Sequence, residues 1–274
     1  MTKSTPVQRR AAFVFGPPLV AATLGFLLLV QGAAGSDFEI LNERRQARID
    51  SGWVVPTPSF TDYQYPRLAT TFAGSDFVLV NKVNPLDPID FEPKVREIKS
   101  SVSLDNSRGL QLRDIAAAAL EKMAAEMDRQ GAGKLFINSA YRSYDYQSEL
   151  FLQKIDQYGE AEALVRSAKP GHSEHQTGLA VDVSVPAQGC AIMQCFGETE
   201  AGKWIAENSW RFGLIVRYEL DTVSTTGYTY EPWHLRYVGA DLAAMYHENG
   251  IHTLEDFWGY PAAPDYEMAA STTD

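Results

Sequence analysis

Cysteine and positive charge are both scarce in this sequence. Two cysteines among 274 residues are too few for a disulfide-stapled scaffold or for a zinc site made of cysteine alone. Lysine and arginine number 24 against 35 aspartate and glutamate residues, a formal net charge of −11. Because nucleic-acid binding depends on clustered Lys and Arg, we expect no nucleic-acid partner. With 45% apolar and 22% charged residues, the composition is that of a globular protein.

Long apolar runs are scarce as well. Residues 11–30 form a stretch without charge that follows Lys3, Arg9 and Arg10. Such a stretch can cross a bilayer, and flanking cations stay on the cytoplasmic side. We therefore expect residues 1–36 to be a signal-anchor or a signal peptide that is cleaved. The rest of the chain would then be held outside the cell membrane by a single helical span, or be secreted.

The remaining chain divides into three parts. Residues 37–76 mix charges, prolines and scattered aromatics without periodicity, and they are predicted to be a stalk or linker. Residues 77–262 contain the periodic segments and are predicted to be one domain. Residues 263–274 are predicted to be a flexible tail.

Helices and strands alternate irregularly in the predicted domain. Apolar side chains at helical spacing predict a helix over 112–127. Strict alternation predicts a strand over 179–185, with Asp182 on the face opposite the valines. Further helices are predicted at 147–158, 204–212 and 241–249, and further strands at 135–137, 214–218 and 233–238. The predicted fold class is α+β, a small antiparallel sheet that carries the site described next and is flanked by helices.

Two of the five histidines stand near carboxylates in the sequence. His175 precedes Asp182 by seven residues, and a glycine between them lets loop and strand converge on one ion. His234 follows Glu231 by three residues. Two imidazoles and one carboxylate leave a position open on tetrahedral zinc, as in catalytic sites, and a free glutamate can deprotonate the bound water. The alternative to a metal site is that Asp182 is a buried, hydrogen-bonded acid and His234 a histidine packed in a strand.

Three blocks of the sequence resemble one enzyme family. They are SAYRS at 139–143, SEHQTGLAVD at 173–182 and EPWHLRYVG at 231–239. Together they are similar to the blocks of VanY-type D-alanyl-D-alanine carboxypeptidases, the M15B metallopeptidases, which include L,D-carboxypeptidases of peptidoglycan. The resemblance covers about residues 78–260, and S-x-H-x-x-G-x-A-x-D followed by E-x-x-H makes it specific.

The resemblance implies roles for individual residues. His175, Asp182 and His234 would bind one zinc ion, and Glu231 would be the general base. Arg142 would face the substrate and bind its carboxylate or the developing oxyanion, for which a guanidinium is suited. The alternative for Arg142 is a surface ion pair.

The resemblance also implies an activity. Gln147 and Ser173 match family positions near the pocket and are predicted to bind substrate, with capping as their alternative. The implied reaction is removal of the C-terminal D-alanine from peptidoglycan stem peptides, D,D- or L,D-specific, by a monomeric zinc carboxypeptidase. The alternatives are a cell-wall endopeptidase and a non-catalytic zinc-stabilised peptidoglycan-binding module.

Six further residues have weaker predicted roles. Outside the cytoplasm, Cys190 and Cys195 are expected to form a disulfide. Glu174 is predicted either to orient a metal ligand through a hydrogen bond or to lie on the surface. His172 is predicted at the pocket rim, and the remaining two histidines, His247 and His252, are predicted to face solvent.

Overall fold

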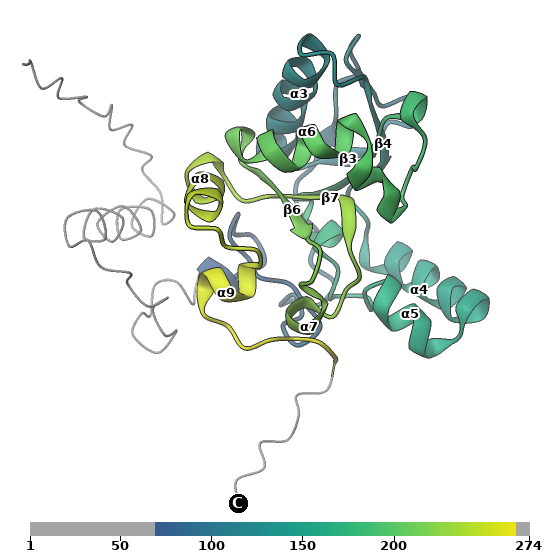
Figure 1. Cartoon of the computed structure of the whole chain (residues 1–274). Coiled ribbons are helices and arrows are strands. Elements are labelled where there is room, and N and C mark those ends of the chain that lie inside the picture. The colour runs from purple at the N-terminus through teal and green to yellow at the C-terminus, as the bar shows by residue number, and fades with distance from the viewer. Residues whose placement is uncertain (1–68, 267–274) are drawn as a thin grey trace, which may run out of the picture.

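The computed structural model describes residues 69–266 (Figure 1). Its helices are α3 (Asp114–Arg129), α4 (Tyr144–Tyr158), α5 (Glu160–Arg166), α6 (Glu200–Asn208), α7 (Val223–Thr226), α8 (Ala240–Glu248) and α9 (Leu254–Trp258). Its strands are β1 (Arg96–Glu97), β2 (Leu104–Asp105), β3 (Gln111–Leu112), β4 (Leu135–Ser139), β5 (Ala180–Ser184), β6 (Leu214–Tyr218) and β7 (Glu231–Tyr237). Short 3-10 helices lie at Glu174–Thr177, Pro186–Gln188, Gln194–Glu198 and Ser209–Phe212.

The larger sheet has five strands in the order β2-β4-β5-β7-β6, and β1 pairs with β3 separately. Its neighbouring strands are antiparallel except β2 and β4, which are parallel. The predicted α+β class is confirmed, but the sheet is not wholly antiparallel as predicted. The parallel strand β2 has only two residues, which is too short for a period-2 pattern to reveal.

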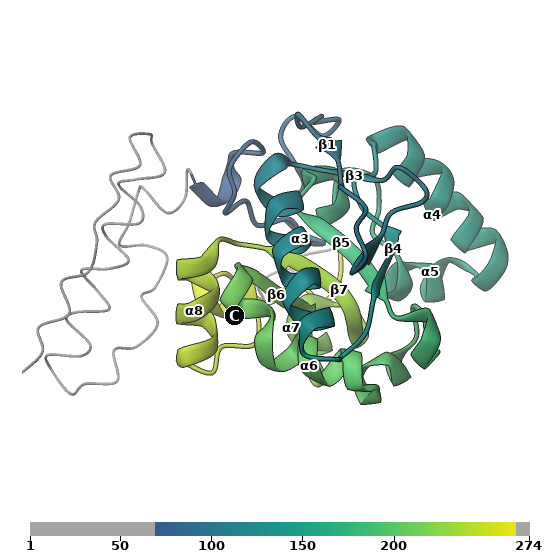
Figure 2. The ribbon, with the colours of Figure 1, turned by 90° about the horizontal axis from the view of Figure 1, so that it is seen from above.

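The main core lies between one face of the sheet and helices α3 and α6. Leu179, Val181, Val183 and Val185 point into this core, as their alternation predicts. Figure 2 shows α3 lying across the strands. Because successive strand residues point to opposite faces, Asp182 is turned to the other face of the sheet. The packing of the valines therefore fixes the direction of this carboxylate.

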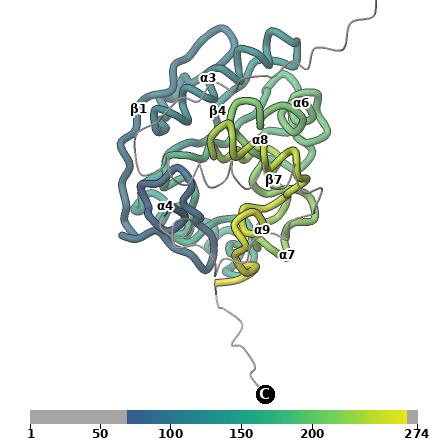
Figure 3. The backbone as a smooth tube through the Cα atoms, turned by 90° about the vertical axis from the view of Figure 1, so that its left-hand side faces the viewer, coloured from purple at the N-terminus to yellow at the C-terminus, as the bar shows by residue number. Residues whose placement is uncertain are grey.

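The two ends of the described chain pack against each other (Figure 3). Lys82 donates from Nζ to the carbonyl oxygen of Pro264 at 3.1 Å, and Ala73 is buried. Residues 69–76 and 263–266 are therefore part of the packed body, whereas the sequence assigned them to the stalk and the tail. Contacts between segments so far apart in the chain leave no local pattern.

Within residues 69–266, none of the helices combines the length and the apolar character that a membrane span requires. The predicted signal-anchor or signal peptide at 1–36 lies outside the described residues, as does most of the predicted stalk. Both assignments stay predictions.

Four charged side chains are buried together between the sheet and α9. Glu174 accepts hydrogen bonds at Oε1 from Arg217 Nε (2.9 Å) and Arg236 Nη1 (2.9 Å). Arg217 donates two more to Glu255 on α9, at 2.7 and 3.0 Å. All four side chains are 0% exposed. Two positive and two negative charges balance, so removing any one of them leaves an uncompensated buried charge.

Replacing Glu255 by glutamine should destabilise the fold. Glu255→Gln keeps the shape of the side chain but removes one of the two counter-charges of Arg217. We expect the free energy of unfolding, measured by urea denaturation at pH 7, to fall by about 3 kcal/mol. Glu198→Ala is the control, because its ion pair with Lys203 is exposed and should contribute less than about 1 kcal/mol. Equal effects of the two substitutions would contradict a structural role for the buried charges.

Candidate metal centre

The predicted metal ligands meet on the sheet face opposite α3. Asp182 on β5 and His234 on β7 are direct partners in the antiparallel register, so their side chains lie side by side on one face. His175 comes from the 3-10 helix Glu174–Thr177, where the sequence predicted a loop. Gly178 ends this helix at a φ of 69°, a conformation that favours glycine, and turns the chain into β5.

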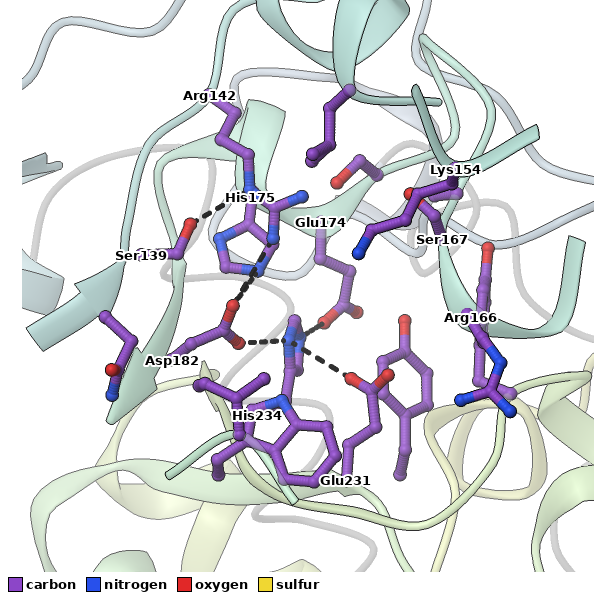
Figure 4. Close-up of a pocket in the computed structure, with 18 of the residues that line it drawn as sticks. Ser139, Arg142, Lys154, Arg166, Ser167, Glu174, His175, Asp182, Glu231 and His234 are labelled. Carbon is purple, nitrogen blue, oxygen red and sulfur yellow. Dashed lines mark hydrogen bonds and ion pairs between the residues drawn. The ribbon is translucent and has the colours of Figure 1, made fainter. Parts of the chain in front are cut away.

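These three residues line a cavity of about 310 Å³ (Figure 4). Asp182 Oδ2 lies 3.3 Å from His175 Nε2, and Asp182 Oδ1 lies 3.0 Å from His234 Nδ1. One ligand atom from each residue lies within 4.8 Å of the other two, and all three residues are buried. Within the part of the chain that the structure describes, this group is the one that could hold a metal ion.

His175 presents an unpartnered nitrogen to this group. Its Nδ1 donates to the carbonyl oxygen of Ala140 at 2.7 Å, while its buried Nε2 has no hydrogen-bond partner. Burial lowers the pKa of His175 to about 4, and the charge on Arg142 adds to that effect. The ring is therefore neutral at pH 7. A neutral imidazole with a free lone pair, beside a carboxylate and a second imidazole, fits the requirements of zinc.

His234 is held between two carboxylates. Its Nδ1 lies 3.0 Å from Asp182 Oδ1, and its Nε2 lies 3.3 Å from Glu174 Oε2. Burial opposes a charge on the ring, but the hydrogen bonds to both carboxylates outweigh it and raise the pKa of His234 to about 9. Glu174 is buried, which excludes the predicted surface alternative, and its contact with His234 agrees with the other predicted role, that of orienting a ligand.

Glu231 lies beside the ligands without belonging to the ligand group. It is the first residue of β7, whereas the predicted strand begins two residues later, at 233. Its Oε2 is 3.9 Å from His234 Nδ1. Burial raises the pKa of Glu231 to about 7, although the charge on His234 opposes the shift. A carboxylate with a pKa near neutrality can both accept a proton and return it.

Arg142 lines the same cavity, with Nη2 3.3 Å from Asp182 Oδ2. It donates from Nε to Ser139 Oγ at 3.0 Å and from Nη1 to Gln147 Oε1 at 2.8 Å. Ser173 also lines the cavity. Gln147 does not line it, because its side chain is fully buried behind the guanidinium. The structure therefore makes Gln147 a positioning residue for Arg142, in place of the predicted direct contact with substrate.

The other singled-out residues lie away from the ligand group. Cys190 and Cys195 form a disulfide in the segment that follows β5. His247 and His252 are exposed, as predicted. His172 is half-buried, its Nδ1 is bonded to a backbone carbonyl, and it does not line the cavity. Its predicted place at the pocket rim is therefore wrong.

Several side chains that line the cavity were missed from the sequence. Lys154 on α4 and Arg166 at the end of α5 both lie on its wall. The ring of Tyr218 lies 4.9 Å from that of His234. No motif marks these residues, but Lys154 follows Gln147 by two helical turns, so helical spacing alone puts both on one side of α4.

The ligand group is expected to bind one zinc ion. His175→Ala removes one of three ligands and should weaken zinc binding at least about 100-fold. Competition with a chromogenic chelator measures the affinity, and elemental analysis measures the zinc content. The control is His252→Ala, which removes an exposed histidine and should bind one zinc ion like the unmodified chain. Equal affinities of the two variants would exclude His175 as a ligand.

Comparisons with known proteins place the chain among the VanY enzymes. The family model VanY, described as D-alanyl-D-alanine carboxypeptidase, matches residues 109–240. The putative carboxypeptidase YodJ of Bacillus subtilis (strain 168) is 38% identical over 183 residues, which are 66% of this chain and 66% of YodJ. The chain thus spans just under two thirds of the length of that relative.

Solved structures give the same result. The LdcB LD-carboxypeptidase is 37% identical with a TM-score of 0.60, over 68% of this chain and 86% of that one. A variant of the vancomycin-resistance D,D-pentapeptidase VanY in complex with Zn(II) is 30% identical with a TM-score of 0.55, over 66% of this chain and 97% of that one. The chain therefore belongs to the VanY family of D-alanyl-D-alanine carboxypeptidases, the family that its three sequence blocks resemble.

Proposed function

We propose that the protein is a zinc-dependent carboxypeptidase that removes the C-terminal D-alanine from peptidoglycan stem peptides. One arrangement carries the proposal: Glu231 and Arg142 lie on opposite sides of the ligand group, and neither belongs to it (Figure 4). A structural zinc site has no use for a free carboxylate beside its ligands. Relatives described as D-alanyl-D-alanine carboxypeptidase and as LD-carboxypeptidase support the reaction and its substrate.

The residues around the cavity divide the work of hydrolysis. A zinc ion on the three ligands would supply a Lewis acid for the scissile carbonyl and lower the pKa of a water molecule. Glu231 takes a proton from the attacking water and gives it to the nitrogen of the departing amino acid. Arg142 donates to the terminal carboxylate or to the developing oxyanion. Water thus adds across one peptide bond, and the products are the shortened peptide and free D-alanine.

The proposal extends to the location of the domain. The charge-free stretch 11–30 behind three cations supports export of the rest of the chain, through a retained membrane anchor or a cleaved signal peptide. The Cys190–Cys195 disulfide supports an oxidising compartment outside the cytoplasm. Protease added to spheroplasts of a cell expressing the full chain should degrade an anchored domain, and a secreted one should appear in the medium.

Replacing Glu231 by glutamine should abolish turnover without loss of zinc. Glu231→Gln keeps the shape of the side chain but cannot accept a proton, so we expect the rate to fall by about 10³-fold. Mass spectrometry measures the release of D-alanine from stem tetrapeptide and from stem pentapeptide, with and without chelator. The peptide that loses D-alanine identifies the bond that is cleaved. Normal turnover by the variant would exclude Glu231 as the general base. No release by the unmodified chain from either peptide would favour the non-catalytic binding module.

Activity should fall on the acid side of neutrality. Glu231 works as a base only when ionised, and burial raises its pKa to about 7, so kcat/KM should decline as pH falls through about 7. A cation bound at the site favours the carboxylate and moves the midpoint lower. Zinc content is measured at each pH, so that loss of metal is not mistaken for protonation. A profile flat from pH 8 to pH 4, with zinc retained, would exclude Glu231 as the base.

A further inference from the structure

The cavity has two cations that the proposed mechanism does not use. Lys154 on α4 and Arg166 on α5 line the same cavity as Asp182 and His234. Figure 4 shows the amine of Lys154 directed into the cavity, with Arg166 farther out on the same side and the ligand group opposite. These two side chains form a cationic wall in a chain whose formal net charge is −11.

The protein's own acids do little to neutralise this wall. Among residues 69–266, no carboxylate forms an ion pair with Lys154, whose Nζ lies 5.4 Å from the centre of the Tyr158 ring. Arg166 lies over the same ring at 5.4 Å and pairs with Glu162 one helical turn away. That pair is more than half exposed on both sides, so it contributes little and exchanges easily for another anion.

The position of Lys154 and Arg166 determines which anionic group of a substrate peptide could pair with them. Of the two roles given for Arg142, we take binding of the C-terminal carboxylate, for which Ser139 and Gln147 hold the guanidinium in place. That carboxylate therefore does not reach Lys154. A carboxypeptidase releases one amino acid, and the charge of that residue is its terminal carboxylate. A second anion that reaches Lys154 must therefore belong to the part of the peptide on the N-terminal side of the scissile bond.

We propose that Lys154, assisted by Arg166, selects peptides that carry a second, free carboxylate N-terminal to the scissile bond. This inference rests on the proposed carboxypeptidase function. Lys154 is only half-buried, so its contribution to selectivity is modest, about fivefold in kcat/KM. Because the attraction is electrostatic and partly solvated, the preference should also shrink as the salt concentration rises.

The test compares two peptides that both end in D-alanine and differ only in one upstream carboxylate, which is free in one and amidated in the other. The unmodified chain should favour the free carboxylate in kcat/KM, chiefly through KM. Lys154→Gln should remove most of that preference, and Lys154→Glu should reverse it. The control is Lys203→Gln, which removes an exposed lysine of α6 and should keep the original ratio. An unchanged ratio in both Lys154 variants would overturn the inference.

Binding measured without turnover separates this inference from the proposed function. In a Glu231→Gln background, calorimetry gives the dissociation constants of the same two peptides with and without Lys154→Gln. If the unmodified chain hydrolyses neither peptide, the carboxypeptidase function fails, while a Lys154-dependent difference in binding still supports selection of the carboxylate. Equal dissociation constants for the two peptides overturn the selection even where hydrolysis proceeds.

Discussion

The site depends on one buried carboxylate, that of Glu174. Its Oε1 accepts hydrogen bonds from Arg217 and Arg236, and its Oε2 lies 3.3 Å from His234 Nε2. Burial alone would raise the pKa of this carboxyl, but the two guanidinium groups outweigh burial and hold the pKa well below its usual range. Glu174 therefore stays ionised, and the imidazole has a fixed acceptor behind it. Through Arg217 the same carboxylate is linked to Glu255 on α9, so the position of His234, a predicted metal ligand, and the packing of a distant helix depend on one set of charges.

This carboxylate explains why the two histidines of the ligand group differ. His175 donates to a neutral carbonyl and has Arg142 nearby, and its pKa falls to about 4. His234 lies between Asp182 and Glu174, and its pKa rises to about 9. At neutral pH the first ring could bind a cation as it stands, whereas the second would have to release a proton to do so. The charge of a bound metal would then replace the charge of the proton, so the two carboxylates would keep a positive partner in either state.

Local features of the site could be predicted from the sequence, and its long-range contacts could not. The alternation along β5 depends on neighbours in the chain, so a period-2 pattern revealed the direction of Asp182, and the short spacing of His175 and Asp182 is equally local. No local pattern indicated the partners of Glu174. Arg217 is 43 residues from Glu174 in the sequence, and its other partner, Glu255, is another 38 residues along the chain. Charged residues are usually exposed, so their burial is visible only once the chain is folded. The two-residue strands were missed for the simpler reason that two residues cover a single period and cannot show an alternation.

The cations in and around the site differ in their burial. Arg217 is 0% exposed and faces two carboxylates of the protein, so its desolvation is compensated within the fold and its loss would disturb the fold. Arg142 is intermediate, with 15% of its side chain exposed and one ion pair to Asp182. Lys154 has no such pair among the described residues, and the Arg166 side chain is 55% exposed. Solvation weakens the contribution of Lys154 and Arg166 to binding. For the same reason the stability of the fold depends little on them. Selection of the substrate at the wall can therefore change by substitution while the buried charges that orient the ligands stay intact.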